Sequence, residues 1–186
     1  MMRKIFSFFI VATAALLCAK TAVAQDYPAG VRIEVAECES DDNTYSIFSY
    51  KDDDGSEAYY LSIGRLSDRL KVESDVFGDF TVDNIDEFCL NIGTTADEAV
   101  AYLDTLLTMF DKEAGSAFEF PCRIALGPNK LGDYSTAECV VVKRFLQGKR
   151  LCFQFESLGR KTEADLTRMA VKSLRLSMKL EAKRKK

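Results

Sequence analysis

Apolar and polar residues alternate along much of the chain. Val31, Ile33 and Val35 alternate with Arg32 and Glu34, and this period of two predicts a strand with one buried face. Similar alternation, or a short apolar run between turn residues, predicts further strands. The predicted strands cover residues 31–38, 44–50, 58–63, 87–92, 117–126, 137–146 and 150–157, with 70–74 as a short candidate and 75–86 as an irregular segment.

Two stretches have apolar residues at helical spacing. The first begins with a capping box, in which the Thr95 side chain accepts from a free backbone N–H and Glu98 reaches back. We expect this helix to end near Lys112. The second helix is predicted to start at 162–165 and to run to about Leu180. Each helix has one apolar stripe and therefore one face to bury.

These elements predict an α+β fold. Short turns join most strands, so we expect a mostly antiparallel sheet of six to seven strands with the two amphipathic helices packed on one face. Each half of the chain has the order strand, strand–turn–strand, Thr-capped helix, which is also consistent with two half-repeats. A single domain is predicted over 25–180, followed by a frayed basic tail over 181–186.

The first 24 residues have the pattern of a secretory signal peptide. Arg3 and Lys4 precede an apolar run over 5–19, and small residues occupy both outer positions of 22–24. The run of about 15 residues is shorter than the roughly 20 that a membrane-spanning helix needs. Cleavage after Ala24 would place the mature chain in the periplasm or outside the cell, and no transmembrane segment is predicted in that mature chain.

Composition narrows the possible chemistry. The chain has no histidine, which excludes imidazole-based catalytic triads and zinc sites that need His. Residues 1–24 hold three basic and no acidic residues, so their removal changes the net charge from −4 to −7. A negative chain is a poor candidate for general nucleic-acid binding, which depends on neutralising phosphates. The acidic loop 52–55 fits a hairpin turn better than a calcium site, because Tyr50 would stand at the first ligand position. We predict no metal and no cofactor.

All cysteines of the predicted mature chain lie in apolar, strand-like stretches. They are Cys38, Cys89, Cys122, Cys139 and Cys152. We favour buried residues over catalytic thiols and leave disulfide pairing among them open, because thiol activation needs an electropositive and partly exposed setting.

The last predicted hairpin allows one pair to be tested by register. A two-residue turn at Gln147-Gly148 would place Cys139 and Cys152 on one face, four residues apart along the ladder or roughly 13 Å. A disulfide needs Cα atoms within about 7 Å, so we expect no bridge between them. The same register assigns five residues of the other face to the core, namely Val140, Val142, Leu151, Phe153 and Phe155.

Aromatic residues crowd the second and third predicted strands. Alternation places Phe48 and Tyr50 on one face, and adjacent Tyr59 and Tyr60 point opposite ways. One face must meet the helices, so the other keeps large aromatic side chains. Two interpretations are open: the segment 75–86 covers them, or they form an exposed recognition patch. Phe48, Tyr50 and Tyr60 are candidate binding residues.

The last helix carries a basic stripe at helical spacing, formed by Arg168, Lys172, Arg175 and Lys179. Residues 160–186 have a net charge of +7. One interpretation is a solvated helix face, because positive charge is favourable near a helix C-terminus. The other is a docking surface for an anionic partner, a lipid headgroup or a second subunit.

Taken together, the residues favour an exported, non-enzymatic binding or assembly protein of the bacterial cell envelope. Its partner would be another protein, a second copy or an anionic surface. No motif names a reaction, so enzymatic activity is left open. The alternatives are an enzyme that uses carboxylates or a thiol, and a structural component that self-associates. An enzyme predicts a deep polar cleft that holds an acid of raised pKa.

Overall fold

The computed structural model describes residues 30–40, 43–72, 80–127, 129–157 and 159–185. The predicted signal peptide and part of the segment predicted as irregular lie outside these residues. Eight strands form one antiparallel sheet whose spatial order is the order of the sequence. They are β1 Arg32–Ser40, β2 Asn43–Lys51, β3 Glu57–Val72, β4 Phe80–Gly93, β5 Ala117–Gly127, β6 Lys130–Arg144, β7 Gly148–Ser157 and β8 Arg160–Thr167.

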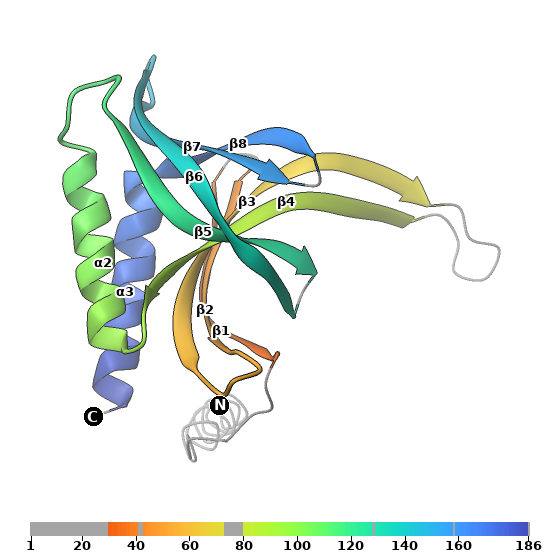
Figure 1. Cartoon of the computed structure of the whole chain (residues 1–186). Coiled ribbons are helices and arrows are strands. Elements are labelled where there is room, and N and C mark those ends of the chain that lie inside the picture. The colour runs from red at the N-terminus through yellow and green to blue at the C-terminus, as the bar shows by residue number, and fades with distance from the viewer. Residues whose placement is uncertain (1–29, 41–42, 73–79, 128, 158, 186) are drawn as a thin grey trace, which may run out of the picture.

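Helix α2 (Ala96–Met109) follows β4, and helix α3 (Arg168–Arg184) follows β8, so the order of four strands and a helix occurs twice. The two helices lie side by side on one side of the sheet (Figure 1). The α+β class and the antiparallel sheet are confirmed, with eight strands in place of six to seven.

The main core lies between the helices and the inner face of the sheet. Leu103 of α2 and Leu174 of α3 belong to the same buried cluster as the sheet residues. The sheet coils so strongly that β4 meets β7 across this face. The ring of Phe88 lies 5.3 Å from that of Phe153 and 4.6 Å from that of Phe155, measured between centroids. Aromatic packing between non-neighbouring strands therefore fills the concave side.

The two halves of the sheet meet at a short ladder. Strand β4 pairs with β5 at three positions, Phe88 with Ile124, Cys89 with Arg123 and Leu90 with Cys122. The neighbouring β3–β4 ladder is much longer and reaches Val72 opposite Phe80. Figure 1 shows β3 and β4 projecting together beyond the other strands. Both strands are longer than predicted, because main-chain pairing in a hairpin continues without a strict alternation of apolar residues.

The prediction for the start of the last helix was wrong. Residues 160–167 form β8, and the N-cap of α3 is Thr167, whose hydroxyl accepts from the Ala170 N–H at 3.0 Å. Ala164 and Leu166 are buried whereas Glu163 is exposed, so this segment has the period of a strand.

The end of α3 also differs from the prediction. The helix continues past Leu180 to Arg184, and Glu181 and Ala182 are buried. The Arg184 guanidinium donates two hydrogen bonds of 2.9 Å to the Glu181 carboxylate. Burial of one face and this local ion pair extend the helix into the segment predicted to fray.

The register of the β6–β7 hairpin corrects another prediction. Arg144 pairs with Gly148, so the loop has three residues, 145–147, in place of two. Pairing shifts by an odd number of residues, which reverses the faces of one strand relative to the other. Cys139 therefore lies opposite Phe153 and faces the main core, whereas Cys152 lies opposite Val140 on the other face. Val140 and Val142 are not core residues, and Cys139 and Val141 take their place beside Leu151, Phe153 and Phe155.

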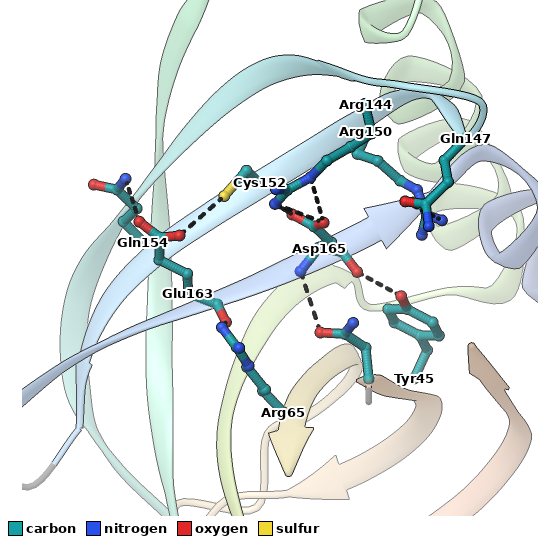
Figure 2. Close-up of polar contacts among 10 residues, drawn as sticks. Tyr45, Arg65, Arg144, Gln147, Arg150, Cys152, Gln154, Glu163 and Asp165 are labelled. Atoms are coloured by element: carbon teal, nitrogen blue, oxygen red, sulfur yellow. Dashed lines mark hydrogen bonds and ion pairs between the residues drawn. The ribbon is translucent and has the colours of Figure 1, made fainter. Parts of the chain in front are cut away.

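The outer edge of β8 is held against β2 and β3 by side chains. The Asp165 N–H donates to the Asn43 side-chain oxygen at 3.2 Å, and the Tyr45 hydroxyl donates to the Asp165 carbonyl. Arg65 donates to the Glu163 carbonyl at 2.9 Å. Figure 2 shows Tyr45 and Arg65 reaching these two carbonyls of β8. Three main-chain polar groups of this edge thus have hydrogen-bond partners without a further strand.

Candidate functional site

The predicted aromatic residues are buried. Phe48, Tyr50 and Tyr60 form a second apolar cluster with Cys89 and Leu131. Phe48 and Tyr60 are stacked with ring centroids 5.6 Å apart. The interpretation as an exposed patch does not hold, because all three rings are at most 7% exposed. The described cover comes from β6, at Leu131, and from β5, at Ala125.

Arg123 forms hydrogen bonds that connect the aromatic cluster with the strands that cover it. Its guanidinium donates to both carboxylate oxygens of Asp52, at 2.9 and 3.0 Å, to the Gly132 carbonyl at 2.7 Å and to the Tyr60 hydroxyl at 3.4 Å. Burial raises the pKa of Tyr60 to about 12. The phenol stays protonated, and the arginine is already hydrogen-bonded to several acceptors. We therefore assign both groups to stabilising the fold and not to binding a ligand.

The basic stripe of α3 is divided between two roles. Arg175 donates to Asp104 of α2 at 3.0 Å, and Arg168 forms an ion pair with Asp111 just after the end of α2, so both hold α3 next to α2. Lys172 is exposed at the helix surface. Lys179, two turns further along, is half-buried. The stripe and the aromatic cluster do not form a common site, because the helices pack on the main core and the aromatic residues form the other cluster.

A partly open pocket of about 350 Å³ lies where α3 begins. Four of its lining residues are basic, namely Lys149, Arg150, Arg168 and Lys172. The other lining residues are Ser40, Gln147, Thr167 and Met169. No acidic residue lines the pocket in the described part of the chain. The lining comes from the end of β1, the β6–β7 hairpin loop, the start of β7, the end of β8 and the first turns of α3.

The strand and the helix position the basic groups differently. Arg150 is only 8% exposed and donates to the Gln147 side-chain oxygen at 3.4 Å (Figure 2). Lys149 donates to the Lys112 carbonyl at 2.5 Å. Arg150 is thus fixed in the wall, whereas Lys172 lies exposed at the rim.

The beginning of α3 adds to the positive potential. The first turn of α3 has no acidic residue and carries Arg168, whereas α2 has Asp97 and Glu98 in its first turn. The N-terminal end of a helix carries partial positive charge, so a basic first turn reinforces it and an acidic one offsets it. The pocket therefore suits an anion that accepts hydrogen bonds.

The hairpin loop beside the pocket exposes two large apolar side chains. Phe145 is 89% exposed and Leu146 is 91% exposed, and Gln147, which follows them, lines the pocket. Leu146 has a φ of 62°, in the left-handed region that favours glycine. Met169, on the pocket wall, is also exposed, at 77%. We call Phe145 and Leu146 the apolar tip.

The thiols are poorly placed for catalysis. All five described cysteines are free, and four of them are buried. Burial raises the pKa of Cys122 to about 11 and those of Cys139 and Cys152 to about 12. A nucleophilic thiol needs a lowered pKa, so these groups favour a role in packing. Within the described residues, no group of three or more Cys, Asp or Glu side chains could hold a metal ion.

Comparison of the chain with protein families, curated proteins and solved structures finds no significant match. Of the predicted site residues, Arg168 and Lys172 line the pocket, and Arg175 and Lys179 do not.

Sequence reasoning missed several residues of this region. The sequence pattern predicts Arg150 only as the first residue of a strand, whereas the structure buries it beside the loop, which is uncommon for an arginine. The segment Lys143 to Arg150 places two apolar residues between basic pairs at a hairpin loop, where small and polar residues are usual. That pattern in the sequence could have indicated a site at this loop.

Proposed function

We propose that this chain is an exported, non-enzymatic binding protein of the cell envelope whose pocket at the start of α3 takes an anionic, phosphate-bearing ligand. The observation that carries the proposal is the pocket lining, with four basic side chains and no acidic one among the described residues. Export is supported by the signal-peptide pattern of the first 24 residues.

The arrangement of donors fits phosphate chemistry. Arginine offers a planar set of N–H donors, and lysine offers a mobile point charge. Arg150 lies buried in the wall, where a hydrogen bond to a charged group is stronger than in open solvent. Lys172 at the rim adds positive charge that attracts an anion over a range set by ionic strength.

Other observations weigh against the alternatives. The raised pKa values of the buried thiols make a thiol enzyme a poor explanation. Self-association through the β8 edge would compete with the contacts that Asn43, Tyr45 and Arg65 make to that edge.

Calorimetric titration with inorganic pyrophosphate tests the proposal. We expect binding that weakens with added salt, and about tenfold weaker binding for Lys172→Gln, because one charge-assisted contact is lost. Lys179→Gln is the matched control: it removes one lysine of the same helix outside the pocket lining. Absence of binding to the unaltered protein, or equal losses from both variants, would reject the pocket as the site.

A further inference from the structure

Among the described residues, the apolar tip joins neither buried cluster, so packing within the fold does not explain its composition. Phe145 and Leu146 belong to the large apolar side chains exposed on the described surface, and they are the two most exposed of them. Adjacent exposed apolar residues on a loop are characteristic of a contact surface. Their side chains add nothing to either apolar cluster of the fold.

The backbone conformation at the apolar tip also indicates a contact surface. Arg144 and Gln147 close a turn, with a hydrogen bond of 3.4 Å from the Gln147 N–H to the Arg144 carbonyl. Leu146 occupies the position of this turn where φ is 62°, and a glycine or asparagine there would avoid the steric conflict of a Cβ. A strained conformation together with full exposure is a cost to folding that a contact made elsewhere would offset.

Basic residues surround the tip on both sides. Lys143 and Arg144 precede it, and Lys149 and Arg150 follow it. Arg144 is paired with Asp165 at 3.0 Å, and Lys172 contributes a further positive charge across the pocket. Exposed apolar side chains flanked by lysine and arginine match the two layers of a lipid surface, which are hydrocarbon inside and phosphate outside.

We propose that the apolar tip inserts into an anionic phospholipid membrane, while the pocket takes the phosphate of a lipid headgroup. This inference rests on the proposed function, because it uses the same pocket and names the source of its phosphate. The protein then lies on the membrane surface, and the described residues contain no helix that is long and apolar enough to cross it. Phe145 and Leu146 enter the interface, and Lys149 and Lys172 meet the headgroups.

A lipid surface fits better than a protein partner because of the size of the patch. Phe145, Leu146 and Met169 are three side chains, whereas a stable protein–protein interface uses roughly 20–30 residues on each side. Insertion of two apolar side chains is enough for reversible membrane binding when basic residues add attraction to anionic lipid.

The chain contains no tryptophan, so a tryptophan at the tip gives a signal free of background. The variant Phe145→Trp is mixed with vesicles of phosphatidylcholine alone or of phosphatidylcholine with phosphatidylglycerol. We expect a blue-shifted emission, and quenching by lipids brominated on their acyl chains, with the anionic vesicles only. Leu180→Trp is the matched control, since Leu180 is also exposed but lies near the far end of α3. Quenching at 180 and not at 145 would overturn the inference.

Co-sedimentation with the same vesicles measures the strength of binding. We expect at least about tenfold weaker binding for Phe145→Ser combined with Leu146→Ser, because two apolar side chains no longer leave water. Leu180→Ser should bind as the unaltered protein does. Equal losses from the two variants would mean that the tip has no special role.

Pyrophosphate titration separates this inference from the function on which it rests. The double tip variant should bind pyrophosphate as the unaltered protein does, because its basic pocket residues are intact. If pyrophosphate binds and anionic vesicles do not, the membrane inference fails and the anion-binding proposal stands. If vesicles bind through the tip and pyrophosphate does not bind, tip insertion stands and the headgroup pocket fails. Tip-dependent dimerisation in the absence of lipid, measured by sedimentation equilibrium, would overturn the membrane as occupant.

Discussion

The Tyr45 hydroxyl donates a hydrogen bond to the main-chain carbonyl of Asp165, 120 positions later in the sequence. It joins the second strand of the sheet to the eighth, which do not share a ladder. The side chain of Asp165 also forms an ion pair with Arg144, as Figure 2 shows. One residue thus links the first half of the sheet, the last strand and the β6–β7 hairpin.

Replacement of Tyr45 by Phe tests this link. The phenol is lost while the buried ring stays, so the Asp165 carbonyl loses a donor in a partly buried setting. We expect the free energy of unfolding to fall by about 1–2 kcal/mol. Urea unfolding followed by circular dichroism measures it. Tyr134→Phe is the comparison: its hydroxyl hydrogen-bonds to Tyr60, but the residue is 66% exposed, so this change should cost less than Tyr45→Phe does.

Arg123 should be far more important for stability than Arg144. Arg123→Met leaves Asp52 and two main-chain carbonyls without their donor at the edge of the aromatic cluster, and we expect a loss of about 3 kcal/mol. Arg144→Met removes a solvent-exposed pair with Asp165 and should cost less than about 1 kcal/mol. Thermal unfolding of both variants measures the difference. Similar losses of stability in the two variants would show that the hydrogen bonds of Arg123 do not hold Leu131 and Ala125 against the aromatic cluster.

Leu146→Gly should make the protein more stable and a poorer membrane binder. Glycine adopts a positive φ without the Cβ conflict, so the free energy of unfolding should rise by up to about 1 kcal/mol. Phe145→Gly is the control, since Phe145 does not have a positive φ and glycine should not stabilise it. Chemical denaturation gives the stabilities. A loss of stability in Leu146→Gly would contradict the argument from strain.

The buried thiols predict a loss of stability at alkaline pH. Burial raises the pKa of Cys139 from 9.0 to about 12, so the folded chain keeps a proton that the unfolded chain releases. Between about pH 9 and pH 12 the folded state binds more protons, and the free energy of unfolding therefore falls as pH rises. Unfolding by urea at a series of pH values measures the slope. Cys139→Ala removes this contribution and should flatten the dependence.

Alkylation provides a separate check on the thiols. Cys38 is half-buried, whereas the other four described cysteines are buried. Iodoacetamide should therefore modify Cys38 first in the folded protein, and peptide mass spectrometry identifies the site. Modification of Cys89 before Cys38 would contradict the described burial.

Patterns among residues close together in the sequence predict much of the fold. Thr95 and Glu98 form the predicted capping box, because a cap depends on residues only three positions apart. The β6–β7 register could not be read in the same way. It depends on whether Leu146 accepts a left-handed conformation, which its side chain disfavours and which no local rule predicts.

The site was predicted only in part, and for a related reason. Arg168 and Lys172 follow from helical spacing, which is a local property. Their partners in the pocket come from β7 and β1, so the grouping depends on how the sheet coils. Phe48 and Tyr50 show the reverse: alternation placed them on one face correctly, but the cover at Leu131 comes from a strand about 80 residues later.

The ladder between β4 and β5 has only three residue pairs, and it separates two halves of the chain that can each fold cooperatively. Each side of it is a contiguous meander with its own helix, so most main-chain pairs close over short sequence distances. Amide protons at Phe88 to Leu90 belong to the narrowest main-chain junction of the sheet, and the halves are otherwise joined by packed side chains and by side-chain hydrogen bonds such as that of Tyr45 to Asp165. During synthesis, the first meander is complete before the second begins, and the shared core forms only when both are present.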